Sequence, residues 1–411
     1  MASFGIPLSG LQANSKSLSV IANNLANLNT NGYKNETLNF GDMLFQMQGT
    51  AGNKDPIQIG SGVQVESTTS NFTNGTVNST GVASNMALQG NGFFVVNNAG
   101  STEYTRAGGF TVNSSGQLVD PSGDLLMGYP ATNGVVSTTS ALGPITVNQA
   151  ATIPAVPTTS FETTTNLQAD SAVGATFSTP ISVVDSLGVS QTLSIQYTNT
   201  GTNAWSYTVT LPASATGATT PTTVASGTLT FDSSGALTSP TGSVTGINIT
   251  GLSDGAAPMK LTWNLTDASG NPTLSQQDSA SATTATNQNG YGVGTLTGYS
   301  VLSDGTVQGQ FTNKQTLALG QVAVAGFANV QGLAQISNGD FQSSVSSGAA
   351  VVGQAGIGGL GTITGGAVEG SNVDLSTEFS SMIVAQQGYE ANAKVLTALN
   401  QVSQATIQAA S

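Results

Sequence analysis

The stretch SNVDLSTEFSSMIVAQQGYEANAKVL, residues 371–396, decides the architecture expected for this chain. Its stripe positions recur at alternating spacings of four and three, which is the period of one face of an α-helix. Ser371 and Asp374 resemble a capping box ahead of that helix. A helix of about 35 residues would be about 50 Å long and would favour a coiled-coil-like partner. The stripe consists of Leu375, Phe379, Met382, Gln386, Tyr389, Ala393 and Leu396.

A second helical stripe lies near the other end of the chain. Pro7 suits the first turn of a helix, and Asn31-Gly32 predicts its end. Neither terminal helix carries the charges that normally cover a water-exposed face, so we expect both to bury most faces against other copies of the chain. The expected helices span about residues 7–30 and 372–411. The N-terminal stripe consists of Leu11, Ser15, Leu18, Ala22 and Leu25.

Between the helices the sequence indicates β-structure. The segment FTVNSSGQL, residues 110–118, resembles LTFDSSGAL, residues 229–237. Both read as a strand, a tight turn with glycine at a positive φ, and a second strand. We therefore expect a mainly β fold with long terminal α-helices. It would combine nested β-barrel or β-sandwich domains with a helical coiled-coil domain formed by the two ends.

Composition shifts divide the expected β region. Residues 131–160 are rich in Thr, Ala and Pro, residues 276–290 are polar, and residues 353–370 are rich in glycine. These joints predict a nested layout. It comprises a terminal helical domain (1–30 and 372–411), a connecting segment (31–70 and 353–371), an inner β domain (71–145 and 286–352) and an inserted outer β domain (146–285).

The overall composition argues against several classes of function. Charged residues make up 7% of the chain, only seven residues are Lys or Arg, and the net charge is −13. Nucleic-acid binding and adhesion to an anionic membrane are therefore not expected. The chain has no Cys and no His, which removes thiol nucleophiles and histidine-based acid–base catalysis. No stretch of about 18 apolar residues predicts membrane insertion.

The glycine-rich stretch GIGGLG, residues 356–361, matches the G-x-G-x-x-G pattern. The residues that follow it are TITGG and not a helix, whereas a dinucleotide site needs a helix N-terminus for the pyrophosphate. We interpret the stretch as a hinge formed by Gly356, Gly358, Gly359 and Gly361.

Acidic and aromatic side chains gather between residues 93 and 129. Glu103, Asp120 and Asp124 are interpreted as solvated turn formers, because no EF-hand pattern or run of alternating acids supplies enough oxygens for a metal. We expect no catalytic residues, no metal and no cofactor. The aromatic residues indicate a domain core or, alternatively, a stacking platform; they are Phe93, Phe94, Tyr104, Phe110 and Tyr129.

Several stretches resemble the flagellar axial protein family, which comprises rod and hook subunits. They are residues 9–34, GNGFF at 90–94, YTRAG at 104–108, SNVDL at 371–375 and residues 382–392. Three further features resemble hook members more than rod members: residues 181–188 with Trp205, residues 290–306 and residues 319–333. Gln387 departs from the family, where a basic residue is usual.

The resemblance implies a hook subunit that self-assembles into a curved, flexible helical tube and transmits torque from rod to filament as a universal joint. It implies export without a cleaved signal peptide through the flagellar type III apparatus, with Phe4 and Leu8 as the export signal. The implied partners are further copies of the chain, the distal rod protein, the hook cap and the hook–filament junction proteins.

The residues expected to carry self-assembly are Leu11, Leu18, Leu25, Leu375, Phe379, Met382, Tyr389 and Leu396. A distal rod subunit and a β-rich surface adhesin remain alternatives. An enzyme of polysaccharide turnover is more distant, because no convergent pair of carboxylates can be placed for it.

Overall fold

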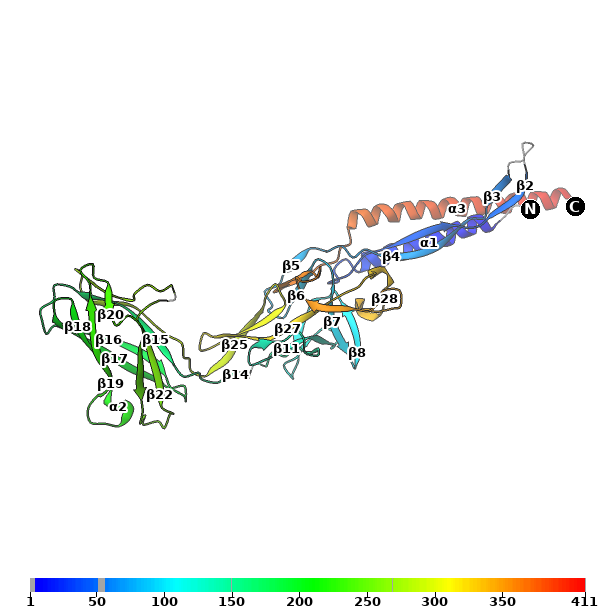
Figure 1. Cartoon of the computed structure of the whole chain (residues 1–411). Helices are drawn as coiled ribbons and strands as arrows, with labels where there is room; N and C mark the ends of the chain where they lie inside the picture. Colours follow the sequence, from blue (N-terminus) through cyan, green and yellow to red (C-terminus); the bar gives the residue numbers. More distant parts are fainter. Residues whose placement is uncertain (1–3, 51–55, 149, 268, 411) are drawn as a thin grey trace. The chain divides into compact units, whose positions relative to one another are not determined.

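The computed structural model describes residues 4–50, 56–148, 150–267 and 269–410. The chain divides into two compact units. Unit 1 comprises Met1–Gln149, Gly298–Gln310 and Thr316–Ser411, and unit 2 comprises Ala150–Thr297 and Phe311–Gln315. Most elements are β-strands, and a long helix lies near each end of the chain (Figure 1). None of the helices within the described residues is long and apolar enough to cross a membrane.

The two terminal helices of unit 1 are α1, Gly5–Ala26, and α3, Leu375–Ala410. Pro7 lies in the first turn of α1 as predicted. Helix α1 ends before the predicted Asn31-Gly32, and Gly32 instead takes a positive φ of 72° in the turn that follows. Asp374, and not Ser371, caps α3, since its Oδ1 accepts a 2.7 Å hydrogen bond from the backbone N–H of Thr377.

The strands of unit 1 follow α1 and precede α3. Strands β25 and β26 lead between the two units. The unit 1 strands are β1 Glu36–Asp42, β2 Phe45–Thr50, β3 Pro56–Gly60, β4 Val63–Ser70, β5 Val77–Ser79, β6 Met86–Gln89, β7 Phe93–Asn98, β8 Ser101–Thr105, β9 Thr111–Val112, β10 Leu118–Val119, β11 Leu125–Thr132, β12 Val135–Val136, β13 Gly143–Pro144, β25 Gly294–Val301, β26 Thr306–Phe311, β27 Thr316–Gly326, β28 Ala334–Gln335, β29 Phe341–Gln342, β30 Val351–Gln354, β31 Thr362–Gly365 and β32 Ala367–Glu369.

The large sheet of unit 1 runs in the order β26-β27-β11-β7-β8-β29-β28, and β30 pairs with β27. The aromatic residues predicted from the sequence form its core and not an exposed platform, because all five are buried. Their rings pack edge to face, as in the pairs Phe94–Phe110 at 5.3 Å and Tyr104–Phe327 at 4.8 Å between ring centroids.

Unit 2 is a sandwich of two sheets. One runs β16-β17-β18-β19-β20, and the other runs β21-β22-β15-β23 with β24 also paired to β15. The described strands close into no barrel, so a sandwich is the form present here. Its strands are β15 Ser160–Gln168, β16 Thr176–Val184, β17 Ser190–Gly201, β18 Ala204–Leu211, β19 Thr222–Phe231, β20 Leu237–Ser239, β21 Val244–Ile249, β22 Met259–Asn264, β23 Leu274–Gln277 and β24 Ala282–Gln288, with the short helix α2 Ala213–Thr216 after β18. Strand β14, Thr152–Ile153, lies outside the sandwich and pairs with β25.

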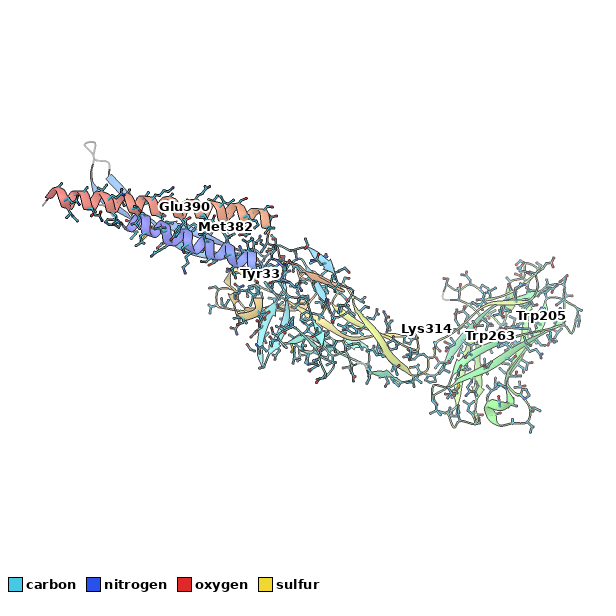
Figure 2. The ribbon with its side chains drawn as sticks, turned by 180° about the vertical axis from the view of Figure 1, so that it is seen from behind. Tyr33, Trp205, Trp263, Lys314, Met382 and Glu390 are labelled. Carbon is cyan, nitrogen blue, oxygen red and sulfur yellow. The ribbon has the colours of Figure 1, made fainter. Side chains whose placement is uncertain are left out.

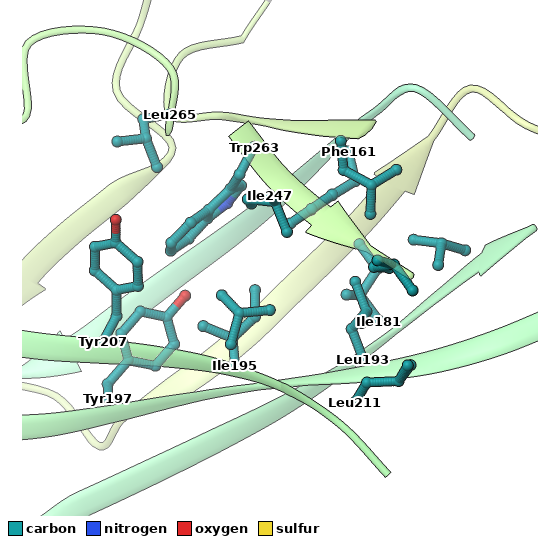
Figure 3. Packing of buried hydrophobic residues seen from close by; sticks show 14 of the residues in the cluster. Phe161, Ile181, Leu193, Ile195, Tyr197, Tyr207, Leu211, Ile247, Trp263 and Leu265 are labelled. Carbon is teal, nitrogen blue, oxygen red and sulfur yellow. The ribbon is translucent and has the colours of Figure 1, made fainter. Parts of the chain in front are cut away.

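The sandwich core follows from the alternation along its strands. Every second residue of β18 is buried, including Trp205, Tyr207 and Val209, because successive side chains of a strand point to opposite faces. Trp263 of β22 lies 5.3 Å from Tyr207 between ring centroids (Figure 3). Its indole N–H donates a 3.2 Å hydrogen bond to the hydroxyl of Thr163. The two sheets thus share one core.

The tight turns predicted within residues 110–118 and 229–237 are confirmed, and three further turns share their construction. An Asp or Asn side-chain oxygen accepts hydrogen bonds from the backbone N–H groups two and four residues later, and the glycine three residues later has a positive φ. The acceptors are Asn113, Asp120, Asp185, Asp232 and Asp267, with Gly116, Gly123, Gly188, Gly235 and Gly270.

Candidate assembly surface

Helices α1 and α3 pack antiparallel in a single register. A Cβ atom added to Gly10 would lie 2.6 Å from Oδ1 of Asn392, and one added to Gly388 would lie 2.7 Å from Oδ1 of Asn14. Both distances are shorter than real Cβ contacts, so each glycine admits a close approach of the other helix. Figure 2 shows the paired helices from behind, with Met382 and Glu390 labelled on α3.

The two contacts are reciprocal because each helix carries a Gly-x-x-x-Asn segment. Asn14 donates to the backbone carbonyl of Gly10 at 2.8 Å, and Asn392 donates to the carbonyl of Gly388 at 2.8 Å. Each asparagine therefore satisfies its amide within its own helix while it packs on the glycine of the other.

A third contact closes the helix pair near the β region. The fully buried Asn24 donates to Oε1 of Glu378 at 3.0 Å, and its Oδ1 accepts from the hydroxyl of Tyr33 at 3.0 Å. Burial, followed by the charges of Glu36 and Glu378, raises the pKa of Tyr33 to about 12. The hydroxyl therefore remains protonated and stays a donor at neutral pH.

The buried face of the helix pair is rotated by one residue from the predicted stripe. The most buried positions include Gly10, Ile21 and Asn24 on α1, and Glu378 and Ala385 on α3. The residues predicted for self-assembly lie beside this face. Leu11, Leu18, Leu25, Met382 and Leu396 are half-buried, whereas Leu375, Phe379 and Tyr389 are exposed.

Three of the predicted residues lie at one groove. Leu8, Leu11 and Tyr389 line a cavity of about 740 Å³ together with Met43 and Val65 of the segment around β1 and β4. Leu8 is exposed, as is Phe4, which precedes the first residue of α1. The structure therefore brings the predicted export residue Leu8 next to two predicted assembly residues.

Apolar side chains are exposed along the whole length of α3. They lie on several sides of a helix that carries few charges. Exposed apolar area of this extent on one helix is typical of a protein–protein interface. The exposed apolar residues of α3 are Leu375, Phe379, Ile383, Val384, Tyr389, Val395, Val402 and Ile407.

A buried ionic cluster fastens the start of the C-terminal segment to the β region. We call Lys34, Arg106 and Glu369 the junction cluster. Nζ of Lys34 lies 2.7 Å from Oε1 of Glu369, and Arg106 lies 3.5 Å from its Oε2, with all three side chains at most 3% exposed. Burial lowers the pKa of Lys34, and the adjacent Glu369 opposes that shift.

Backbone groups complete the junction cluster. Lys34 also donates to the carbonyl of Thr73, Arg106 donates to that of Gly90, and the N–H of Gly75 donates to Glu369. Lys34 and Arg106 lie in two of the family-like motifs, whereas no pattern in the sequence predicted Glu369 as their partner. Their separation along the chain left no local signal for the pairing.

The predicted hinge glycines lie in the loop between β30 and β31. Gly356, Gly358 and Gly359 are exposed and have positive φ angles, whereas Gly361 is buried and donates its N–H to the carbonyl of Asn91 at 2.7 Å. Both flanking strands pair within unit 1. Their role as a hinge stays a prediction.

Four family models match segments of the chain. The flagellar basal body protein FlaE D2 domain matches residues 146–291, and the flagellar hook protein FlgE/F/G D1 domain matches residues 87–168. The flagella basal body rod protein model matches residues 7–34, and the flagellar basal body rod FlgEFG protein C-terminal model matches residues 364–409. These matches include most of both terminal helices.

Relatives of known name match nearly the whole chain. It is 36% identical over 414 residues to the flagellar hook protein FlgE of Escherichia coli (strain K12), which covers 97% of this chain and 98% of that protein. The hook protein FlgE of Borreliella burgdorferi is 32% identical over 442 residues, with 98% of each covered. The crystal structure of Helicobacter pylori flagellar hook protein FlgE2 shares the fold, with a TM-score of 0.52 at 15% identity over 70% of this chain and 98% of that one.

Proposed function

Because this chain belongs to the flagellar hook protein FlgE family and is a structural subunit of the hook, we propose that its copies assemble through the outer faces of the terminal helices. The apolar residues left exposed on α3 carry this proposal. A contact between different faces of identical subunits builds an open helical assembly when its rotation does not close into a ring. The distal rod subunit and the adhesin are thereby not favoured.

The different lengths of the two helices support assembly through α3. Helix α3 has 36 residues and α1 has 22. Continuing the register of the Gly10–Asn392 contact places Gly5 level with Thr397, so the last turns of α3 extend past the first residue of α1. Val402 and Ile407 in those turns are exposed and are free to pack against helices of neighbouring subunits.

The tube must bend while it turns if it acts as a universal joint between rod and filament. We infer that rigid domains tilt at the joints between them. These domains are the four predicted from the sequence: the terminal helical domain (1–30 and 372–411), the connecting segment (31–70 and 353–371), the inner β domain (71–145 and 286–352) and the outer β domain (146–285). Loop 356–361 would supply one hinge. Hydroxyl-rich surfaces exchange hydrogen bonds for water at little net cost, which suits contacts that shift during each revolution.

The same family membership supports the remaining proposals. The partners would be the distal rod protein, the hook cap, the hook–filament junction proteins and the flagellar type III export apparatus. Exposed Phe4 and Leu8 would form the export signal. The family is a structural one, and we expect no enzymatic activity.

Electron microscopy after salt-induced polymerisation tests the assembly surface. The double variant Leu375→Ser with Phe379→Ser should give few or no tubes under conditions in which the parent chain forms curved tubes. Val345→Ser is the matched control, because it removes an apolar side chain that is fully exposed and lies outside the helices. Tubes of normal length and number from the double variant would contradict the proposal.

A further inference from the structure

Three buried carboxylates converge in unit 1. Glu103, Asp124 and Asp340 are 8%, 7% and 2% exposed, and one carboxylate oxygen from each lies within 4.8 Å of those of the other two. They come from three distant parts of the sequence, so no local motif predicts the cluster. Asp120, also buried, lies four residues before Asp124 and accepts its backbone N–H at 2.8 Å.

The strand pairing explains the convergence. Phe341 pairs with Tyr104 in the antiparallel β29–β8 ladder, so Asp340 lies opposite Thr105. Thr105 and Glu103 are two residues apart on β8 and therefore share one face. The Thr105 hydroxyl lies on that face, close to the carboxyl group of Asp340. Asp124 directly precedes β11, which pairs with β7 next to β8.

No basic side chain compensates these carboxylates within the described part of the chain. Both of its ion pairs end on Glu369 and occupy Lys34 and Arg106. A buried carboxylate that is neither paired nor coordinated is costly, so the cluster requires protons or a cation.

The side chain of Glu103 points independently to a ligand. It is more than nine-tenths buried, and among the described residues it has no hydrogen-bond donor and no ion-pair partner. A glutamate on a strand interior normally turns outward to water. One carboxylate oxygen of Glu103 on β8 instead lies within 4.8 Å of those of Asp124 and Asp340.

We propose that Glu103, Asp124 and Asp340 bind one divalent cation, with Ca²⁺ the preferred ion. Calcium takes six to eight oxygen ligands in flexible geometry, and carboxylates supply one or two each. The Thr105 hydroxyl and water would complete the shell. The bound ion would fasten the beginnings of β11 and β29 to β8 and so stiffen the inner sheet of the subunit.

Calorimetric titration of the full chain with CaCl₂, after EDTA treatment and at pH 7.5, tests the proposal. We expect one ion per chain and a rise of a few degrees in Tm at saturating calcium. Asp340→Asn and Asp124→Asn should each weaken binding on the order of tenfold or more, since affinity follows ligand charge. Asp42→Asn, which removes an exposed carboxylate elsewhere in unit 1, should bind as the parent does.

Two outcomes overturn the proposal. One is the absence of saturable binding by the full chain up to about 1 mM calcium, the weak end for extracellular calcium modules. The other is binding that persists unchanged in both folded variants, which would place the ion elsewhere. The titration of the unmodified chain tests the first outcome without any variant. The proposal can therefore still be refuted if a variant fails to fold. Repeating the titration with magnesium in place of calcium tests whether Ca²⁺ is the preferred ion.

Discussion

Asn392 on α3 packs against Gly10 on α1 so closely that Oδ1 of the asparagine lies 2.6 Å from where a Cβ atom of residue 10 would be. The equivalent contact of Asn14 with Gly388 is 2.7 Å. Two points of this kind, four residues apart on each helix, define one register. Apolar contacts alone specify register less strictly, because neighbouring registers bury similar area.

Replacing Gly10 by valine should destabilise the helix pair by about 1–3 kcal/mol, because the new side chain displaces Asn392 and strains the close contact. Thermal unfolding followed by far-UV circular dichroism measures the loss. Ala22→Val is the matched control, since it adds the same β-branched side chain on an exposed face of α1. Combining Gly10→Val with Asn392→Ala should recover part of the stability that Gly10→Val loses. Equal losses of stability in Gly10→Val and Ala22→Val would contradict the role of the Gly10–Asn392 contact.

Neutralising Glu369 should strongly destabilise unit 1. Glu369→Gln leaves Lys34 and Arg106 buried without their counter-charge, which costs about 3–5 kcal/mol. Both tryptophans of the chain lie in unit 2, so tryptophan fluorescence reports that unit alone. In the variant, the far-UV circular dichroism transition should therefore occur at a lower urea concentration than in the parent. The fluorescence transition should occur at the same urea concentration as in the parent. Glu390→Gln, an exposed substitution, serves as control, and no shift in either signal for Glu369→Gln would contradict the prediction.

The acidic cluster predicts an inverted dependence of stability on pH. The pKa of Asp340 is raised to about 6 in the folded chain, so its favourable contribution is complete below about pH 4 and is lost as the pH rises through about 6. In EDTA, Asp340→Asn should therefore gain about 2 kcal/mol relative to the parent at pH 7 and little at pH 4. Calorimetric scans at the two pH values measure this difference. A variant that is less stable than the parent at pH 7 would show that the charge is compensated.

Two glycines of the same turn type separate backbone strain from steric overlap. Gly270 and Gly235 have φ angles of 84° and 80°, but only at Gly235 would a Cβ atom meet a backbone oxygen, that of Gln276 at short range. Gly270→Ala should cost about 1 kcal/mol from the positive φ alone. Gly235→Ala should cost clearly more, because a backbone carbonyl cannot rotate away. Urea unfolding monitored by tryptophan fluorescence measures the free energy of unfolding of both variants. Equal losses in the two variants would show that the steric overlap at residue 235 does not contribute.

Local patterns in the sequence predicted the parts of the fold that depend on neighbouring residues. The period of the terminal segments predicted both helices, composition predicted the β region, and the repeated segments 110–118 and 229–237 each predicted a tight turn. Small errors arose where two local signals competed. Ser371 and Asp374 are both good caps, and the choice of Asp374 depends on where the chain leaves β32.

What the sequence determined by itself was therefore the class of each element and, through long shared motifs, the family. Tertiary structure alone decided the contact face of the helices, the partner of Lys34 and Arg106, and the meeting of Glu103, Asp124 and Asp340. The face that α1 and α3 share lies one residue away from the apolar stripe, because glycine and asparagine, which carry no hydrophobic signal, make the closest contacts. Pairing across hundreds of residues depends on strand register and burial, and these are properties of the packed chain that no local period contains.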